Sequence, residues 1–137
     1  MSLTPVIAIH LAAALAAVVI GPIALWARRA GQPRTRLHRA AGYAWVTLMV
    51  ITAASAIFIS DPQVPNLAGF SAIHLLVPVV LLALVHAFRQ LIKGNIRGHR
   101  QAMVSLYVSA CLVAGAFTLL PGRRLGQLVW GQWMGLV

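Results

Sequence analysis

Four long apolar stretches dominate this 137-residue chain and limit what it can fold into. They run over about residues 3–26, 37–59, 69–88 and 102–120, and only short connections separate them. Each is close to or above the roughly 20 residues that a helix needs to cross about 30 Å of hydrocarbon. Because a bilayer core satisfies no backbone polar group, such segments fold as helices. The sequence therefore predicts an all-α integral membrane protein, one four-transmembrane-helix bundle that forms a single membrane domain over residues 1–137.

The composition supports a membrane protein and excludes an ordinary soluble domain. Hydrophobic residues make up 61% of the chain and charged residues only 9%, against about 25% charged in soluble domains. The first apolar stretch lacks a basic leading segment and is too long for the apolar core of a signal peptide. We therefore expect it to be retained as a span.

The basic residues are spread unevenly over the connections and predict an orientation. Of the eleven Lys and Arg residues, nine flank the first and third connections, whereas Arg123 and Arg124 follow the fourth stretch. The positive-inside rule then predicts a multi-pass protein of the bacterial inner membrane with both termini outside. We expect residues 121–137, with Trp130 and Trp133, to form an interfacial segment on the outer surface. Cations gathered where spans end favour lipid headgroups as partners and disfavour nucleic acid.

Two of the five histidines lie inside apolar stretches at matching depths. With the first and third stretches running inward, His10 and His74 each lie roughly 7 to 9 Å below the outer boundary. An ionisable side chain in a span is costly and usually has an inward-facing partner, and two neutral imidazoles can hold a haem iron. We predict that His10 and His74 are the axial ligands of an outer haem b. The alternative is that each forms a hydrogen bond with Ser, Thr or a backbone carbonyl across helices.

The other three histidines lie toward the predicted cytoplasmic face. His86 is about 18 Å from His74 along its helix, a spacing that suits two stacked cofactors, so we predict a second haem held by His86 with His38 or His99. Twelve residues at about 100° each leave His86 roughly 120° around the helix from His74, unless Pro78 rotates the lower half. Interfacial positions among arginines are the alternative for His38 and His99.

Charged residues set further limits on the chemistry. Arg39 and Arg100 on the inner side and Arg123 on the outer side are predicted to pair with haem propionates, and plain topology determinants are the alternative. Ligation by two histidines fills both axial positions and favours electron transfer over oxygen binding, with a quinone as the natural electron source. The single carboxylate, Asp61, excludes paired-carboxylate catalysis and argues against a zinc hydrolase, so no catalytic residue is predicted.

Two segments carry motifs at the starts of the second and fourth stretches: LHRAAGY at residues 37–43 and KGNIRGHRQAM at residues 93–103. They resemble the signatures of a family of small bacterial membrane proteins known only as a domain of unknown function. That resemblance implies four transmembrane helices and no particular activity. The layout of the histidines is also similar to that of four-helix di-haem b-type cytochromes, which implies one haem near each membrane face.

Two functions from different classes follow. The first is a b-type cytochrome-like electron-transfer protein, and hence a haem-dependent oxidoreductase or electron carrier, with one or two haem b groups. The second is a cofactor-free accessory subunit of a larger membrane complex, or a homo-oligomer. Ala13, Ala17 and Gly21 recur at every fourth position and permit close helix approach in either case.

Overall fold

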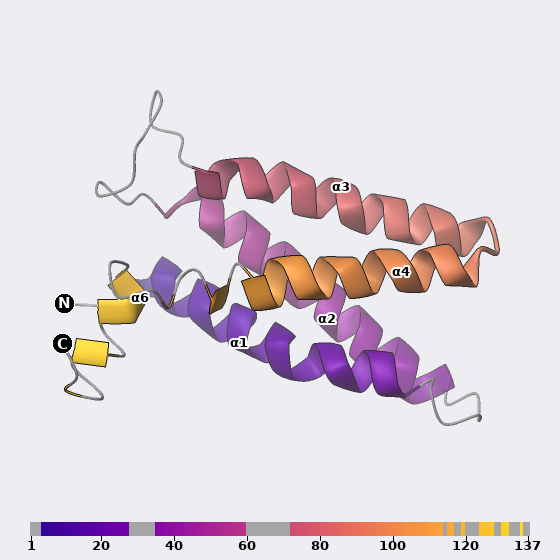
Figure 1. Ribbon diagram of the computed structural model, residues 1–137, viewed down its shortest axis with the longest axis horizontal. Helices are drawn as coiled ribbons and strands as arrows, with labels where there is room; N and C mark the ends of the chain where they lie inside the picture. The colour runs from indigo at the N-terminus through magenta and orange to yellow at the C-terminus, as the bar shows by residue number, and fades with distance from the viewer. Residues whose placement is uncertain are drawn as a thin grey trace.

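Every regular element among the described residues of the computed structural model is helical (Figure 1). The structure describes residues 4–27, 35–59, 72–113, 115–116, 119, 124–127, 130–131 and 135. The elements are α1 (Pro5–Trp26), α2 (Thr35–Ile57), α3 (Ala72–Ile92), α4 (Ile96–Leu106), its π-helical continuation η1 (Tyr107–Val113) and the short α6 (Arg124–Gln127). Of these, α1, α2 and α3 are long and apolar enough to cross a membrane.

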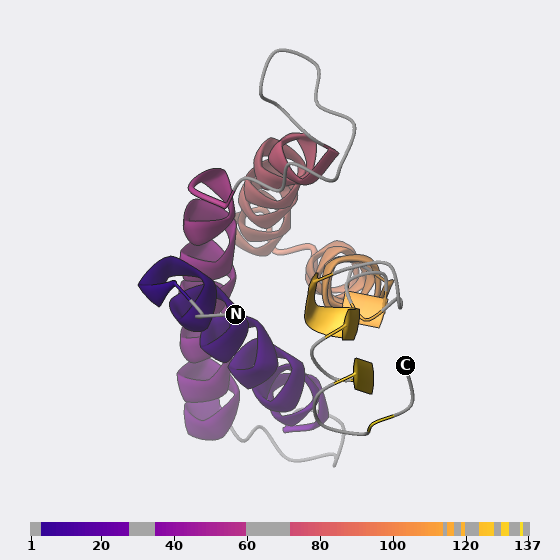
Figure 2. The same ribbon diagram turned by 90° about the vertical axis from the view of Figure 1, so that its left-hand side faces the viewer.

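The helices form a bundle in which successive helices pack on one another. α1 pairs with α2, α2 with α3, and α3 with α4, while η1 returns to contact α1. Viewed along the bundle, α2 and α4 lie on opposite sides, and α1 and α3 occupy the other diagonal (Figure 2). The end at which α2 and α4 begin is here named the basic end, because it carries six of the described cations: Arg36, Arg39, Arg89, Lys93, Arg97 and Arg100.

Small side chains let α1 approach α2 closely. Ala13, Ala17, Gly21 and Ala24 are the buried residues of α1, and their spacing of three and four keeps them on one helical face. The expected small-residue packing face is thus confirmed. His10 continues the same face one turn before Ala13, which directs its ring toward α2.

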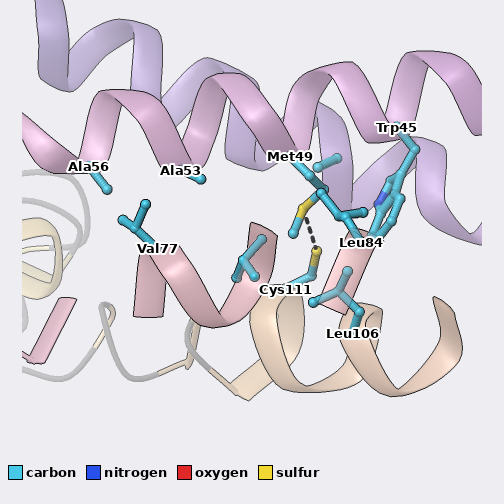
Figure 3. Packing of buried hydrophobic residues seen from close by; sticks show 10 residues of the cluster. Trp45, Met49, Ala53, Ala56, Val77, Leu84, Leu106 and Cys111 are labelled. Atoms are coloured by element: carbon cyan, nitrogen blue, oxygen red, sulfur yellow. Dashed lines mark hydrogen bonds between the residues drawn. The ribbon is translucent and has the colours of Figure 1, made fainter. Parts of the chain in front are cut away.

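The interior at mid-depth is one apolar cluster drawn from all four main helices (Figure 3). Trp45 and Met49 of α2 cluster with Leu84 of α3 and Leu106 of α4, and the Cys111 thiol lies 3.8 Å from the Met49 sulfur. Cys111 is therefore a buried packing residue. The complete cluster is Ala17, Trp45, Met49, Ala53, Ala56, Val77, Val80, Leu84, Leu106 and Cys111.

The turn between α3 and α4 explains much of the motif at residues 93–103. Gly94 has a φ of 76°, a conformation that favours glycine, and it reverses the chain. Asn95 then caps α4, because its side-chain oxygen accepts a 3.0 Å hydrogen bond from the Gly98 amide. A Cβ at Gly98 would lie 2.6 Å from the Asn95 side-chain nitrogen, so this glycine leaves room for the cap. The motif thus encodes a sharp turn and a helix start that position His99.

Helices α3 and α4 extend by several residues beyond the apolar stretches that predicted them. α3 continues past residue 88 to Ile92, and α4 begins at Ile96, before residue 102. The apolar run marks only the part of a helix that hydrocarbon surrounds, whereas the flanking turns carry Arg89 and Arg97 and stay helical. The predicted end of the fourth stretch and most of the tail at 121–137 lie outside the described residues.

Candidate functional site

Four of the five histidines place a ring nitrogen against a backbone carbonyl of a neighbouring helix. A carbonyl oxygen only accepts hydrogen bonds, so the nitrogen that faces it carries the proton. The position of the ring proton, and with it the nitrogen that keeps a lone pair, follows from these contacts. The nitrogen-to-oxygen distances are 3.0 Å for His10 Nδ1 to Thr52, 2.8 Å for His38 Nδ1 to Ala24, 2.8 Å for His99 Nδ1 to Ala87 and 3.2 Å for His74 Nε2 to Ile57.

His10 makes the most elaborate of these contacts. Its Nδ1 lies 3.0 Å from the Thr52 carbonyl oxygen and 3.0 Å from the Ser55 hydroxyl oxygen. Ser55 donates to the same Thr52 carbonyl at 3.0 Å, which leaves its oxygen as a second acceptor for the His10 proton. Two acceptors hold the half-buried ring, and its lone pair therefore resides on Nε2.

His38 and His99 lie at the basic end on opposite sides of the bundle. His38 shares the buried face of α2 with Ala41 and Trp45, and His99 shares the inward face of α4 with Leu106. Both side chains are half-buried, and both donate Nδ1–H to a carbonyl, so both keep the Nε2 lone pair. Sequence reasoning treated these two residues as alternatives, whereas their contacts are equivalent.

His10 and His74 both contact backbone carbonyls of α2. The common depth expected for the two rings stays a prediction. Their carbonyl partners, Thr52 and Ile57, lie five positions apart near the end of α2, about 7.5 Å along its axis. The contacts differ in one respect, because His74 turns Nε2 toward its carbonyl whereas His10 turns Nδ1. Each ring contacts a backbone carbonyl of α2, which is the arrangement of the hydrogen-bonding alternative.

His86 occupies a different environment. Its side chain is exposed, whereas the adjacent Ala87 is completely buried against the bundle interior. Val80 and Leu84 share the buried face of α3 with Ala87, and at about 100° per residue this leaves His86 on the outward face. The phase difference between His74 and His86 thus persists in a helix that contains Pro78.

The arginines predicted to hold propionates are dispersed. Arg39 is exposed on α2, one residue after His38, and Arg100 is exposed on α4, one residue after His99. Arg123 lies outside the described residues, as does Asp61. Within the described part of the chain, no three His, Cys, Asp or Glu side chains gather as a metal cluster would require.

A groove that sequence reasoning missed lies between α1 and α4 at the basic end. Its volume is about 570 Å³. Tyr107 borders it and donates a 2.9 Å hydrogen bond to the Val18 carbonyl. One sequence signal does point here, because Pro22 leaves the Val18 carbonyl without its usual helical amide. The lining residues are Pro22, Ile23, Leu25, Trp26, Arg100, Val104 and Tyr107.

These features define a helical membrane protein with histidines at its helix contacts. The chain belongs to a family described as predicted membrane protein (DUF2306), whose model matches residues 7–125. The family resemblance drawn from the two motifs is thereby confirmed, and with it a lipid bilayer as the surroundings of the protein. Neither the curated proteins nor the solved structures include a match.

Proposed function

We propose that this protein is a membrane-embedded, b-type cytochrome-like electron carrier that holds haem through histidines on opposite helices of the bundle. One observation supports the proposal. His10, His38 and His99 each donate Nδ1–H to a backbone carbonyl on a neighbouring helix. Metal-ligating histidines almost always donate their second ring N–H in this way, which fixes the tautomer and aims the lone pair.

The proposed topology has four spans in the bacterial inner membrane, with both termini outside. The proposed fourth span covers about residues 102–120. Its first part is supplied by α4 and η1, which run without a break from Ile96 to Val113. The basic end then faces the cytoplasm.

At the basic end, His38 and His99 fit an inner haem better than any pair that includes His86. They sit on α2 and α4, on opposite sides of the bundle, with Nε2 available on both. The carbonyls of Ala24 and Ala87 orient the two rings. His86 is exposed on the outward face of α3. It would need to move around its helix to face a haem held by His38 and His99.

At the other end, His10 and His74 are the proposed outer ligands. His10 presents Nε2, whereas His74 donates Nε2–H to Ile57, so ligation through Nε2 of His74 requires that bond to break. The inner pair is therefore the stronger half of the proposal. A quinone is the expected electron source, and Arg39 is the described cation adjacent to His38 that would pair with an inner propionate.

Haem held by these histidines would supply reversible one-electron chemistry. The chain supports it with oriented imidazoles and with apolar surroundings. Trp45, Met49 and Leu106 belong to the buried apolar cluster of the bundle. No group in this region acts as an acid or base under the proposal.

Absorbance spectroscopy tests the proposal directly. Protein purified in mild detergent from haem-replete cells should be red and should show the reduced α band of bis-histidine haem b. His38→Ala and His99→Ala should each remove the inner haem, while His86→Ala, the matched control on the outward face, should keep the full content of haem per protein. A colourless preparation, or equal haem loss in all three variants, would contradict the proposal.

A cofactor-free accessory subunit is the second candidate, and one observation favours it. The histidine contacts already join helix to helix, from α1 to α2, α2 to α1, α3 to α2 and α4 to α3, without any cofactor. Such hydrogen bonds strengthen helix association in lipid. This function predicts haem-free protein in which His38→Ala and His99→Ala loosen the bundle, and which co-purifies with a larger membrane complex.

A further inference from the structure

We propose that the groove between α1 and α4 at the basic end binds one anionic phospholipid, with Arg100 contacting the headgroup phosphate and the apolar walls holding the upper acyl chain. The proposal is independent of haem. It rests on the lining of the groove, on its depth and on the charge of this end of the bundle.

The lining has one cationic group and an otherwise apolar surface. α1 contributes Pro22, Ile23, Leu25 and Trp26, and α4 with η1 contributes Arg100, Val104 and Tyr107. The phenol of Tyr107 is already committed to the Val18 carbonyl, so its ring faces the groove as an apolar wall. A ligand that fits this lining has one anionic end and an apolar body, which describes a phospholipid. A quinone head would instead need donors for two carbonyl oxygens.

The groove extends along the helices from the membrane surface inward. Arg100, Val104 and Tyr107 lie on successive turns, so the lining reaches about 10 Å from the arginine toward the bundle centre. Trp26 also lines the groove and is 75% exposed, and tryptophans favour the headgroup region of a membrane. Phosphate at the surface and acyl chain below match this order. The volume of about 570 Å³ is within the usual range of roughly 300–1,000 Å³ for small-molecule sites.

Charge complementarity selects an anionic headgroup over a zwitterionic one. The basic end carries Arg97, Lys93 and four further cations, and the described residues include no Asp or Glu that could neutralise Arg100. The anionic lipids of a membrane surface are attracted to clusters of this kind. Arg100 is the cation that lines the groove, so it combines the general attraction with a defined position.

Lipid titration followed by native mass spectrometry tests the proposal. Delipidated full-length protein is titrated with phosphatidylglycerol and, separately, with phosphatidylcholine of identical chains. Wild type should bind the first phosphatidylglycerol molecule about tenfold more tightly than phosphatidylcholine, and Arg100→Gln should remove most of that difference. Arg97→Gln, which removes the same charge one turn away outside the lining, should preserve it. Val104→Trp, which fills the groove but keeps every charge, should also abolish the tight site.

Several outcomes would overturn the proposal. Equal losses in Arg100→Gln and Arg97→Gln would show attraction by surface charge alone, and undiminished binding by Val104→Trp would place the lipid elsewhere. Inorganic phosphate at millimolar concentration should not displace the lipid, because displacement would mean an anion site without a chain site. Displacement of phosphatidylglycerol by a soluble quinone analogue would assign the groove to a quinone instead.

Discussion

The phenol of Tyr107 in η1 donates a 2.9 Å hydrogen bond to the carbonyl of Val18 in α1, 89 positions away in the chain. Val18 is four residues before Pro22, and proline has no amide proton to give to that carbonyl. A helix interior normally pairs every carbonyl, and lipid offers no substitute donor. The tyrosine therefore repairs a defect that the proline creates, and in doing so it fixes η1 against α1.

This repair predicts a coupled pair of substitutions. Tyr107→Phe should reduce the free energy of unfolding by about 1–3 kcal/mol, because it leaves the half-buried Val18 carbonyl unpaired. In a Pro22→Ala background the restored amide can bond to Val18, so the same Tyr107→Phe change should cost much less. Unfolding of the four proteins in detergent, followed by circular dichroism, measures the coupling. Equal losses in both backgrounds would contradict the repair.

Gly21 predicts a steric effect at the same contact. A Cβ at this position would overlap Cε2 of the Tyr107 ring, would lie 2.6 Å from its Cδ2 and would lie 3.1 Å from Trp45 Nε1. Gly21→Ala should therefore destabilise the protein by about 1–3 kcal/mol through overpacking. Gly42→Ala is the matched control in α2, because its Cβ would have no neighbour within 4 Å. The control should be neutral or stabilising by up to about 1 kcal/mol, since alanine favours helix. Similar effects at both glycines would refute the close contact.

The cap of α4 predicts that the stability losses of two substitutions, at Asn95 and at Gly98, do not add. Asn95→Ala removes the cap on the Gly98 amide and should cost about 1 kcal/mol. Gly98→Ala should cost a similar amount, because the new Cβ displaces the Asn95 side chain. The double variant should lose little more than either single one, as the cap is lost only once. Full additivity in thermal unfolding would mean that Gly98 acts independently of the cap.

The histidines differ in expected structural importance even without a cofactor. His99→Leu should destabilise the bundle by about 1 kcal/mol or more, because it leaves the buried Ala87 carbonyl without the imidazole donor. His86→Leu should stay within about 0.5 kcal/mol of wild type, because its side chain is exposed on the outward face of α3. Haem-free protein unfolded in detergent provides the comparison. A larger loss for His86→Leu would contradict the orientation of α3.

The helical fold could be predicted from the apolar stretches of the sequence. The partners of the histidines could not. Three spans were readable because hydrophobic length and helix length agree in a bilayer. The equal depth of His10 and His74 stays a prediction, which rests on the rise per residue of a helix. Their actual partners, the carbonyls of Thr52 and Ile57, were not readable, because every residue has a carbonyl and only packing decides which one is near.

The position of His86 around its helix could be predicted only in part. Its 120° offset from His74 was visible in the sequence, but whether Pro78 would correct it depended on the local geometry of α3. The groove was harder still. It depends on the meeting of Pro22 and Tyr107, from distant parts of the chain, and only the missing proline amide hinted that an external donor would be needed.

The change of pitch at Tyr107 divides one continuous helix between two neighbours. The α4 portion is tied to α3 through His99 and Ala87, while the η1 portion is tied to α1 through Tyr107 and Val18. The π-helical segment η1 therefore connects the pair formed by α3 and α4 to the pair formed by α1 and α2. A rotation of one helix pair would be passed to the other pair through this short segment, on the side of the bundle where η1 contacts α1.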